Sequence, residues 1–544
     1  MIKLSTFRNK YVHNFIRHNK NIFKKSNSEE NIVLTEFNGW PITHIAISNC
    51  LLALENNYTF KKIAYSENSF KKFLKKKNFY EKSKFILGKF FNLRTFGIYK
   101  SFGINDFLSI DYDKTLENNS KIILKKILGE LKFKRDVLKI KINKIPIGDL
   151  IYDSYLKEYN QPTIEIKSNS FEEYLHAAIQ YFLIWEKFFK TKKVLGVLSS
   201  HSVYMSSIPS RIGIYYNSIC LVCNAEKLYR LSKKNKESDK EFLFFNKTKK
   251  KINKKELRVG LSIAAKRLDS RFNGKIGVDM SYLTKTAYGK NSAKKILKDS
   301  KKIKVLIAPH AFSDAPHTLG NHLLPDYYEW LNFVLINLNK EKYDCYIKCH
   351  PNFVDYFDRT IEYVKEFQRK YPFLNYIQPE ISHKQLIHEG INVVITCHGS
   401  IGGEYPYFNI PVVNASINNP HIDYKFNLHP NNITNLKKIL NSLDKINIKI
   451  NKKEILEYYF FKNIFYSNNW LFEDFSKLIN YVGNFKKIHK DSKTYQYWLI
   501  NWNLKKQKNI TKSINDFINS DDYILTYKNK NILFSEHLKR LWKK

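Results

Sequence analysis

The sequence predicts an α/β protein of two Rossmann-like domains that face each other across a cleft, with a helical C-terminal tail. Three observations predict this fold. The 544 residues are too many for one ordinary core. Short apolar runs alternate with helical stretches in two separate series, which is typical of doubly wound parallel sheets. The end of the chain is aromatic and helical in pattern, so we expect domains at 1–300 and 301–450 and a helical segment at 451–544.

The first series predicts the sheet of the N-terminal domain. It opens with an apolar run that breaks at the turn-forming residues Asn38-Gly39-Trp40-Pro41 and leads into a helix. Strand, Gly-containing loop, helix and strand form the βαβ unit of a parallel sheet. Strands are expected at 31–37, 61–65, 194–199 and 214–223, and helices at 43–54 and 171–191. The Lys-, Asn- and Glu-rich stretch 230–258 is interpreted as a solvated loop or a helical excursion.

The second series predicts the sheet of the C-terminal domain. Strands are expected at 304–309, 344–348, 392–396 and 410–414, and helices at 324–338 and 356–370. In open α/β sheets, ligands bind at the carboxyl ends of strands, where loops meet helix N-termini. Polar residues that directly follow the strands are therefore the candidate site.

Composition and charge narrow the class of protein. The formal net charge is +42; scattered Lys with abundant Asn and Ile reflects AT-rich coding, yet a basic surface attracts nucleotide phosphates, nucleic acid or anionic lipid. We find no motif for specific nucleic-acid binding, so peripheral contact with an anionic inner membrane fits better. Six cysteines indicate a reducing compartment, and Cys220 and Cys223 are interpreted as buried strand residues. Without a secretory leader or a long apolar stretch, we expect a cytoplasmic protein.

The first polar loop of the second series spans 309–317 and holds His310 and Asp314. Two histidines and an aspartate could bind a metal ion, but their spacing fits no helical zinc motif and two prolines make the segment a loop. Binding of substrate hydroxyls or phosphate is favoured, with a structural loop as the alternative.

The second and third polar loops carry groups suited to a nucleotide. His350 can donate to a phosphate oxygen, and Pro351 stiffens the backbone after it. In the loop 396–404, glycines permit close backbone approach, Ser400 offers a donor and Glu404 can accept from ribose hydroxyls. Three such loops in order within one sheet indicate a single nucleotide pocket.

At these residues the chain resembles the bacterial capsule and surface-polysaccharide biosynthesis proteins, the group that includes the Kdo-transferring capsule enzymes. The resemblance spans about 31–430 and implies a GT-B fold, metal-independent glycosyl transfer without a cofactor, and donor binding in the C-terminal domain. It is carried by His310, Asp314, 326–330, Lys348-Cys349-His350-Pro351, His398-Gly399-Ser400, Glu404 and 410–413, and in the N-terminal half by 147–153 and 200–204.

The resemblance also implies roles for the residues of the C-terminal loops. The His-Pro pair is similar to the element that holds the CMP part of the donor in bacterial sialyl- and Kdo-transferases. His350 and Pro351 would then contact donor phosphate or ribose beside Lys348, and Gly399, Ser400 and Glu404 would complete the nucleotide pocket. Family members often have Thr or Ser before the Gly-Ser turn where this chain has His398, which leaves the donor base and sugar open.

A transferase needs a base that deprotonates the acceptor hydroxyl, and in a GT-B enzyme it would come from the N-terminal domain. Asp149, which follows the strand-like stretch 139–147, is the candidate, with a helix N-cap as its structural alternative. His310 and Asp314 are expected to assist from the second domain. Competing bases are Asp153, Glu36 and His201, and His201 and Arg211 are also candidates for contacting the acceptor or balancing charge. The pair Asp111 and Asp113 has the spacing of a metal clamp but lacks a preceding nucleotide-binding pattern.

These expectations combine into a glycosyltransferase of capsule- or lipopolysaccharide-type biosynthesis. It would use a nucleotide-activated sugar, with a CMP-sugar favoured, and a glycan or glycolipid acceptor. The alternatives are a CDP-glycerol-type phosphotransferase, a nucleotide-sugar epimerase and a non-catalytic polyanion-binding protein.

Overall fold

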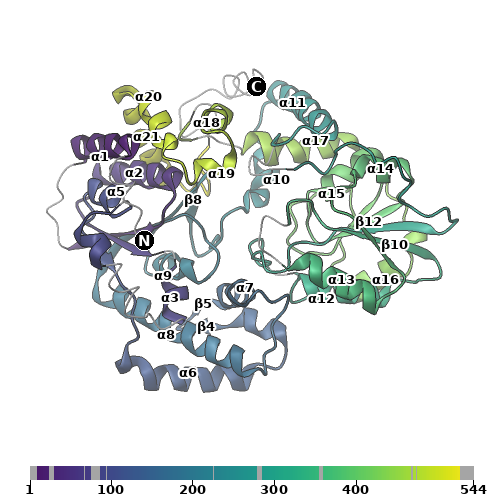
Figure 1. Cartoon of the computed structure of the whole chain (residues 1–544), viewed down its shortest axis with the longest axis horizontal. Helices are drawn as coiled ribbons and strands as arrows, with labels where there is room; N and C mark the ends of the chain where they lie inside the picture. Colours follow the sequence, from purple (N-terminus) through teal and green to yellow (C-terminus); the bar gives the residue numbers. More distant parts are fainter. Residues whose placement is uncertain are drawn as a thin grey trace.

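The computed structural model confirms an α/β chain with two Rossmann-like domains, each built on a mainly parallel sheet (Figure 1). The first domain fills one lobe and the second domain the other. The structure describes residues 9–23, 30–66, 68–74, 86–93, 95–224, 226–278, 285–320, 322–353, 359–466, 470–472 and 475–526.

The first sheet, sheet A, has the strand order β3-β2-β1-β6-β7-β8, and β8 alone runs antiparallel to its neighbour. Its strands are β1 (Asn31–Phe37), β2 (Lys61–Ser66), β3 (Asp106–Leu108), β6 (Lys193–Ser199), β7 (Ile219–Cys223) and β8 (Leu228–Leu231). Val33 and Leu34 in the central strand β1 are both fully buried. Burial on both faces explains why β1 is a continuous apolar run rather than an alternating one.

Helices cover both faces of sheet A. Helix α8 (Asn169–Thr191) packs on one face, and α2 (Pro41–Glu55) lies on the other. Helix α2 is buried on nearly all sides, because the C-terminal helices α20 (Lys493–Ile500) and α21 (Leu504–Ile518) pack against its outer side. Tyr495 of α20 accepts or donates a hydrogen bond at His44 Nδ1 of α2, at 2.6 Å.

The remaining elements of the first lobe surround this core. They are α1 (Lys10–Ile22), α3 (Ser69–Leu74), α5 (Thr95–Ser101), α6 (Glu117–Glu130), α7 (Gly148–Tyr159), α9 (Ile208–Tyr215), α18 (Phe475–Val482), α19 (Phe485–Ile488) and the hairpin β4 (Lys141–Ile142) and β5 (Ile145–Pro146). Helices α18 to α21 thus lie on the same lobe as α1 and α2 (Figure 1).

The second sheet, sheet C, is fully parallel with the order β11-β10-β9-β12-β13. Its strands are β9 (Ile303–Ile307), β10 (Tyr343–Lys348), β11 (Leu374–Ile377), β12 (Val393–Thr396) and β13 (Val412–Asn414). Its helices are α12 (Tyr327–Asn337), α13 (Thr360–Lys370), α14 (His383–His388), α15 (Ile401–Glu404) and α16 (Ile433–Leu440). Between the lobes run α10 (Phe245–Lys249), α11 (Lys254–Phe272) and α17 (Lys452–Phe460), and Gly260 of α11 lies against Phe460.

Shorter helical segments connect these elements. The 3₁₀ segments are η2 (Lys114–Leu116), η3 (Lys134–Lys139), η4 (Met205–Ser207), η5 (Glu241–Phe244), η7 (Tyr405–Phe408) and η8 (Leu443–Lys445), and a π-helical turn, η9, spans Phe461–Phe465. None of the described helices has the length and apolar character needed to cross a bilayer.

Three local expectations need correction. The strand expected at 214–223 begins only at Ile219, because α9 occupies the first residues and Asn217 turns the chain with φ 60°. The strand-like stretch 139–147 is a two-residue hairpin, in which Asn143 and Lys144 both have positive φ. The stretch 230–258 is not one solvated loop: after the end of β8 it contains η5, α10 and the start of α11, as its helical alternative expected. The expected start of the helix 356–370 lies outside the described residues.

Candidate functional site

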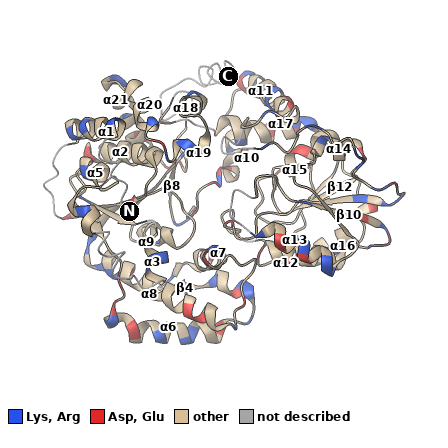
Figure 2. Cartoon of the chain, in the orientation of Figure 1, with Lys and Arg blue, Asp and Glu red and all other residues tan. Residues whose placement is uncertain are grey.

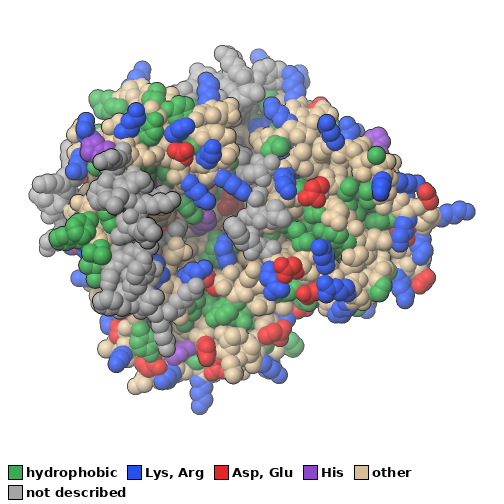
Figure 3. Space-filling model, in the orientation of Figure 1, with side chains coloured by type: hydrophobic (Ala, Val, Ile, Leu, Met, Phe, Trp, Pro, Cys, Tyr) green, Lys and Arg blue, Asp and Glu red, His purple; other side chains and the backbone are tan. Residues whose placement is uncertain are grey.

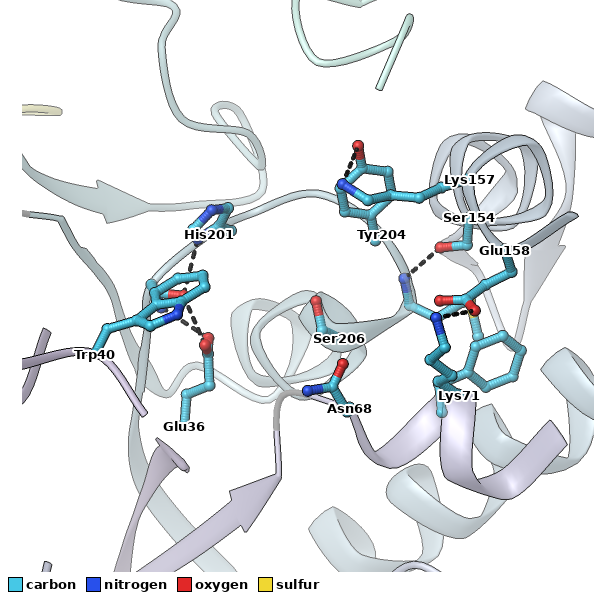
Figure 4. Close-up of a pocket in the computed structure, with 13 residues that line it drawn as sticks. Glu36, Trp40, Asn68, Lys71, Ser154, Lys157, Glu158, His201, Tyr204 and Ser206 are labelled. Carbon is cyan, nitrogen blue, oxygen red and sulfur yellow. Dashed lines mark hydrogen bonds and ion pairs between the residues drawn. The ribbon is translucent and has the colours of Figure 1, made fainter. Parts of the chain in front are cut away.

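A polar pocket of about 240 Å³ opens at the carboxyl edge of sheet A, where β1, β2 and β6 end (Figure 4). Ligand crevices of open α/β sheets form at this edge. The pocket is lined by Glu36, Trp40, Asn68, Phe70, Lys71, Ser154, Lys157, Glu158, Ser200, His201, Tyr204, Met205 and Ser206. Two of the competing base candidates, Glu36 and His201, therefore share one cavity.

Glu36, Ser200 and His201 form a hydrogen-bonded chain in this pocket (Figure 4). The buried Glu36 carboxylate accepts from the Ser200 backbone N–H at 2.8 Å and from Ser200 Oγ at 2.6 Å. Since the hydroxyl proton points at Glu36, Ser200 Oγ is left to accept from His201 Nδ1, 2.8 Å away. This fixes the Nδ1–H tautomer of His201, so that Nε2 is the basic nitrogen of an exposed imidazole.

The opposite wall of the pocket touches the second domain. Tyr204, which has a φ of 62°, lies in the loop after β6, and its hydroxyl donates to Asp314 of the loop after β9 at 3.4 Å. Lys157 of α7 donates to the same hydroxyl at 3.2 Å and sits over the Tyr204 ring. The carboxyl edges of the two sheets therefore meet beside the pocket, and the exposed Asp314 lies at that meeting point.

Asp149 and Arg211 lie together in a buried ion pair. Arg211, which is 1% exposed, donates from both guanidinium nitrogens to the two carboxylate oxygens, at 2.9 and 2.7 Å. Burial alone would raise the pKa of Asp149, but the charge and hydrogen bonds of Arg211 hold it well below its usual range. A carboxylate with a lowered pKa is a poor proton acceptor. The Arg211 guanidinium is buried and already donates to Asp149, so it is not placed to bind a substrate. The geometry thus favours a structural role for both residues.

Asp153 is also bound to a cation, in this case across the domain boundary. His317 Nδ1 donates to Asp153 at 2.5 Å, and His317 Nε2 faces the Pro325 carbonyl at 2.8 Å. With Asp153 ionised, both ring nitrogens face acceptors, and His317 is then the doubly protonated imidazolium. Burial would lower the pKa of His317, but the Asp153 charge and hydrogen bond raise it. Nearby, the Tyr152 hydroxyl donates to Asp326 at 2.6 Å and joins the same two domains.

In the second domain, His310 and His398 stack on each other at the ends of β9 and β12. Their ring centroids are 4.2 Å apart, and the His310 ring also stacks on Tyr327 at 4.7 Å. The Tyr327 hydroxyl lies 2.6 Å from His398 Nε2. Burial lowers the pKa of His310 to about 4, so this stack is neutral at pH 7. The first and third polar loops are therefore in direct contact.

Lys348 ends β10, His350 follows it, and the two form a largely buried basic group with His383. Lys348 Nζ donates to the Pro379 carbonyl at 3.0 Å and lies 3.4 Å from His383 Nε2. Burial lowers the pKa of Lys348 to about 8. Burial and the charge of Lys348 lower the pKa of His350 to about 4. Pro351 is buried beside them.

Glu404 balances part of this positive charge. Its carboxylate accepts from Arg271 of α11 at 2.6 Å and from the Tyr288 hydroxyl at 2.6 Å, and Arg271 also lies 3.5 Å from Ser400 Oγ. Glu404 is only 6% exposed, so it holds Arg271 in place rather than facing solvent. At the start of α15, a Cβ on Gly399 would lie 3.1 Å from Thr396 Oγ1, which explains the small residue after His398.

The structure brings together His310, His398, Gly399, Ser400 and Glu404 at one edge of sheet C, and the charges of Lys348, Arg271 and Glu404 all act on His350. Sequence reasoning missed Arg271, Tyr288 and His383, which reach the edge from α11, from the segment after it and from α14. Arg271 and Tyr288 lie more than a hundred residues from Glu404, and no local pattern marks them.

The structure also shows the surroundings of the paired cysteines and of the paired aspartates. Cys220 and Cys223 are both buried in β7, and burial raises the pKa of both thiols. Asp113 bonds Thr115 and Lys187 on the surface, at the start of η2. No group of three or more His, Cys, Asp or Glu side chains that could hold a metal ion occurs within the described ranges.

Comparison with known proteins gives distant structural matches. They include the UDP-GlcNAc 2-epimerase from Neisseria meningitidis bound to UDP-GlcNAc (11% identity, 80% of this chain and 94% of that chain, TM-score 0.24) and S. aureus MnaA with UDP (13%, 81% and 92%, TM-score 0.21). The wall teichoic acid polymerase TagF also aligns (11%, 96% and 100%, TM-score 0.19). At these TM-scores the alignments decide neither fold nor function. No family model and no curated protein matches the chain.

Proposed function

We propose that the protein is a glycosyltransferase that binds a nucleotide-activated sugar at the carboxyl edge of sheet C and an acceptor in the pocket of sheet A. One observation carries the proposal: the two carboxyl edges meet at Tyr204 and Asp314, with a buried cationic group on one side and a hydrogen-bonded histidine on the other. A transfer reaction needs these two environments side by side.

On the acceptor side, His201 is the proposed general base. The chain from Glu36 through Ser200 holds its proton on Nδ1 and leaves Nε2 to receive one. The acceptor hydroxyl oxygen attacks the anomeric carbon of the donor sugar, the bond from that carbon to the phosphate oxygen breaks, and the hydroxyl proton passes to Nε2. The pair of Asp149 and Arg211 supports α7 and α9 beneath the pocket.

On the donor side, Lys348, His350 and Arg271 are proposed to neutralise the departing phosphate. Burial lowers the pKa values of Lys348 and His350 below their usual range, and the charge of Lys348 lowers that of His350 further. A bound phosphate would favour the protonated form of both groups. His398, Gly399 and Ser400 are proposed to contact the same nucleotide from the ends of β12 and α15.

The finer assignment rests on the resemblance of the chain to capsule and surface-polysaccharide enzymes. By that resemblance the donor is a CMP-sugar held through His350 and Pro351, and the acceptor is a glycan or glycolipid. The high positive charge favours work next to an anionic membrane.

A thermal-shift screen with CMP, CDP, UDP and GDP tests the proposal. We expect one nucleotide, with CMP first, to stabilise the protein by a few degrees, because a ligand at about 100 times its Kd adds about 2.7 kcal/mol. His350→Ala should abolish the shift, whereas His176→Ala, in a part-buried position on α8, should not. Indifference of the wild-type protein to all four nucleotides would count decisively against a nucleotide-dependent enzyme.

The product of the reaction separates a transferase from the other enzyme classes. Incubation with the preferred donor alone should release sugar only slowly by hydrolysis, and addition of a glycan or glycolipid acceptor should accelerate nucleotide release. Formation of an epimeric nucleotide sugar without acceptor would contradict the proposal.

A further inference from the structure

Residues 86–91, which we call the exposed turn, present large apolar side chains to solvent. Phe90 is 75% exposed, Ile86 64%, Phe91 55% and Leu87 44%. Within the ranges that the structure describes, no other six-residue stretch exposes four large hydrophobic side chains to this extent. Contiguous exposed apolar groups mark a surface that meets another apolar phase.

The exposed turn is anchored at the end of sheet A where the pocket opens. The Phe91 N–H donates to the Leu87 carbonyl at 2.9 Å. Gly88 lies so close to the Phe96 ring that a Cβ there would be 2.7 Å from it. The Phe96 ring in turn packs on Phe37, the last residue of β1, at 4.8 Å between centroids. Since Phe37 directly follows Glu36, which lines the pocket, the turn is anchored at the same carboxyl end of β1 as the pocket.

Cationic side chains lie next to this apolar surface. Helix α1 packs along α5, with Ile16 3.5 Å from the Cβ position of Gly97, and it exposes Lys10, Arg17 and Lys20. Figure 2 shows Lys and Arg on α1, and Figure 3 shows apolar side chains at the surface of the same lobe. Apolar side chains beside cations are what an anionic lipid surface attracts, because the rings enter the acyl boundary while the cations contact headgroups.

We infer that the exposed turn docks the protein on an anionic lipid bilayer, with Phe90 and Phe91 inserted below the headgroups. The cations of α1 next to the turn select a negatively charged surface, which favours anionic lipid over an apolar groove of a protein partner. The inference deepens the proposed function, on which it rests, since a docked turn would place the acceptor pocket at the membrane, where a lipid-linked acceptor lies.

Vesicle co-sedimentation of the full chain tests this inference. Vesicles of equal parts phosphatidylglycerol and phosphatidylethanolamine should bind the wild-type protein, and vesicles of phosphatidylcholine alone should bind it far less. The double substitution Phe90→Ser and Phe91→Ser should weaken binding to the anionic vesicles by about tenfold or more. The matched control is Ile122→Ser with Phe133→Ser, which changes two side chains that are 70% and 71% exposed elsewhere on the first domain and should leave binding unchanged.

A second control separates the turn from the other apolar surface of the same domain, at Ile500 and Leu504, which are 65% and 58% exposed. Loss of vesicle binding in Ile500→Ser with Leu504→Ser, with retention in the Phe90 and Phe91 variant, would overturn the inference. Absence of wild-type binding to anionic vesicles would overturn it too. The nucleotide thermal shift should be unaltered in every variant, so failure of membrane docking is distinguishable from failure of the nucleotide site.

Discussion

The carboxyl edges of the two sheets are built from the same fold element but hold opposite environments. At sheet A, polar side chains line an open pocket, and a carboxylate, a hydroxyl and an imidazole form one hydrogen-bonded chain. At sheet C, the basic groups Lys348, His350 and His383 are largely buried and hold fewer protons than they would in water. Under the proposed function, the edge of sheet A accepts the proton and the edge of sheet C binds the anion.

The largest expected effect is on the proton-accepting edge. His201→Ala should lower the rate of sugar transfer by about 10²- to 10⁴-fold, because the acceptor hydroxyl loses its base. Nucleotide binding should persist, since His201 lies on the other domain. Steady-state transfer and a nucleotide titration on the same preparation measure both quantities, with His176→Ala as the matched control on α8.

Ser200→Ala tests the hydrogen-bonded chain at the edge of sheet A. It removes the oxygen between Glu36 and His201 without touching either charge or ring. The tautomer of His201 is then no longer fixed, and we expect a drop in turnover of about tenfold with a displaced pH–rate profile. A purely structural role for the chain would lower stability and leave the pH profile in place.

A second large effect is expected at the buried ion pair beneath the pocket. Asp149→Asn should cost about 3–5 kcal/mol of the free energy of unfolding, because Arg211 would be left as an uncompensated buried charge. The double variant Asp149→Asn with Arg211→Met should recover part of that loss. Chemical denaturation measures both. A fully stable Asp149→Asn protein with no transfer activity would return Asp149 to the role of base.

A smaller effect is expected at the anion-binding edge. Lys348→Met should weaken nucleotide binding by about 10- to 150-fold, the range for a hydrogen bond to a charged group. Lys302→Met is the matched control, since Lys302 is exposed and precedes β9 at the opposite edge of sheet C. Calorimetric titration at pH 8 should also show uptake of about half a proton on binding, because an anion raises the pKa of Lys348 from about 8.

The pH dependence of stability gives a further test of burial at both edges. His310, His350 and His489 each have a pKa lowered to about 4, mainly by burial. Between pH 6.5 and pH 4 the unfolded chain therefore binds more protons at these sites, and their contribution to stability falls as pH falls. We expect the melting temperature to decrease through this window. The decrease should be less steep in His489→Phe; an unchanged slope would contradict the burial account for that site.

Much of the fold could be predicted from patterns in the sequence. The apolar run at 31–37 forms β1 with the expected bounds, because a short apolar run between polar turns is typical of a buried strand in a parallel sheet. The short strands β3 and β11 were not expected. Asp106–Leu108 has three residues, and Leu374–Ile377 is half-buried and polar in the middle, so neither departs from a loop in composition.

The candidate site could be predicted only where its residues lie near the end of a strand. His350 and His398 lie shortly after β10 and β12, and Glu404 ends the short helix α15 that follows β12, so the rule for open sheets leads to these candidates. Arg271 and Tyr288 reach Glu404 from distant segments, and only the packed structure brings them there. Asp149 shows the opposite case. From the sequence, an acidic residue in a first helical turn is a candidate base, but in the fold its carboxylate forms an ion pair with Arg211.

The most direct test of the division between the two edges is a crystal structure of the chain with its preferred nucleotide. The account predicts density for the phosphate within hydrogen-bond distance of Lys348 or His350, at the carboxyl edge of sheet C, with the pocket around His201 left for the acceptor. Phosphate bound in the pocket between Glu36 and Tyr204 instead, with nothing at sheet C, would contradict it.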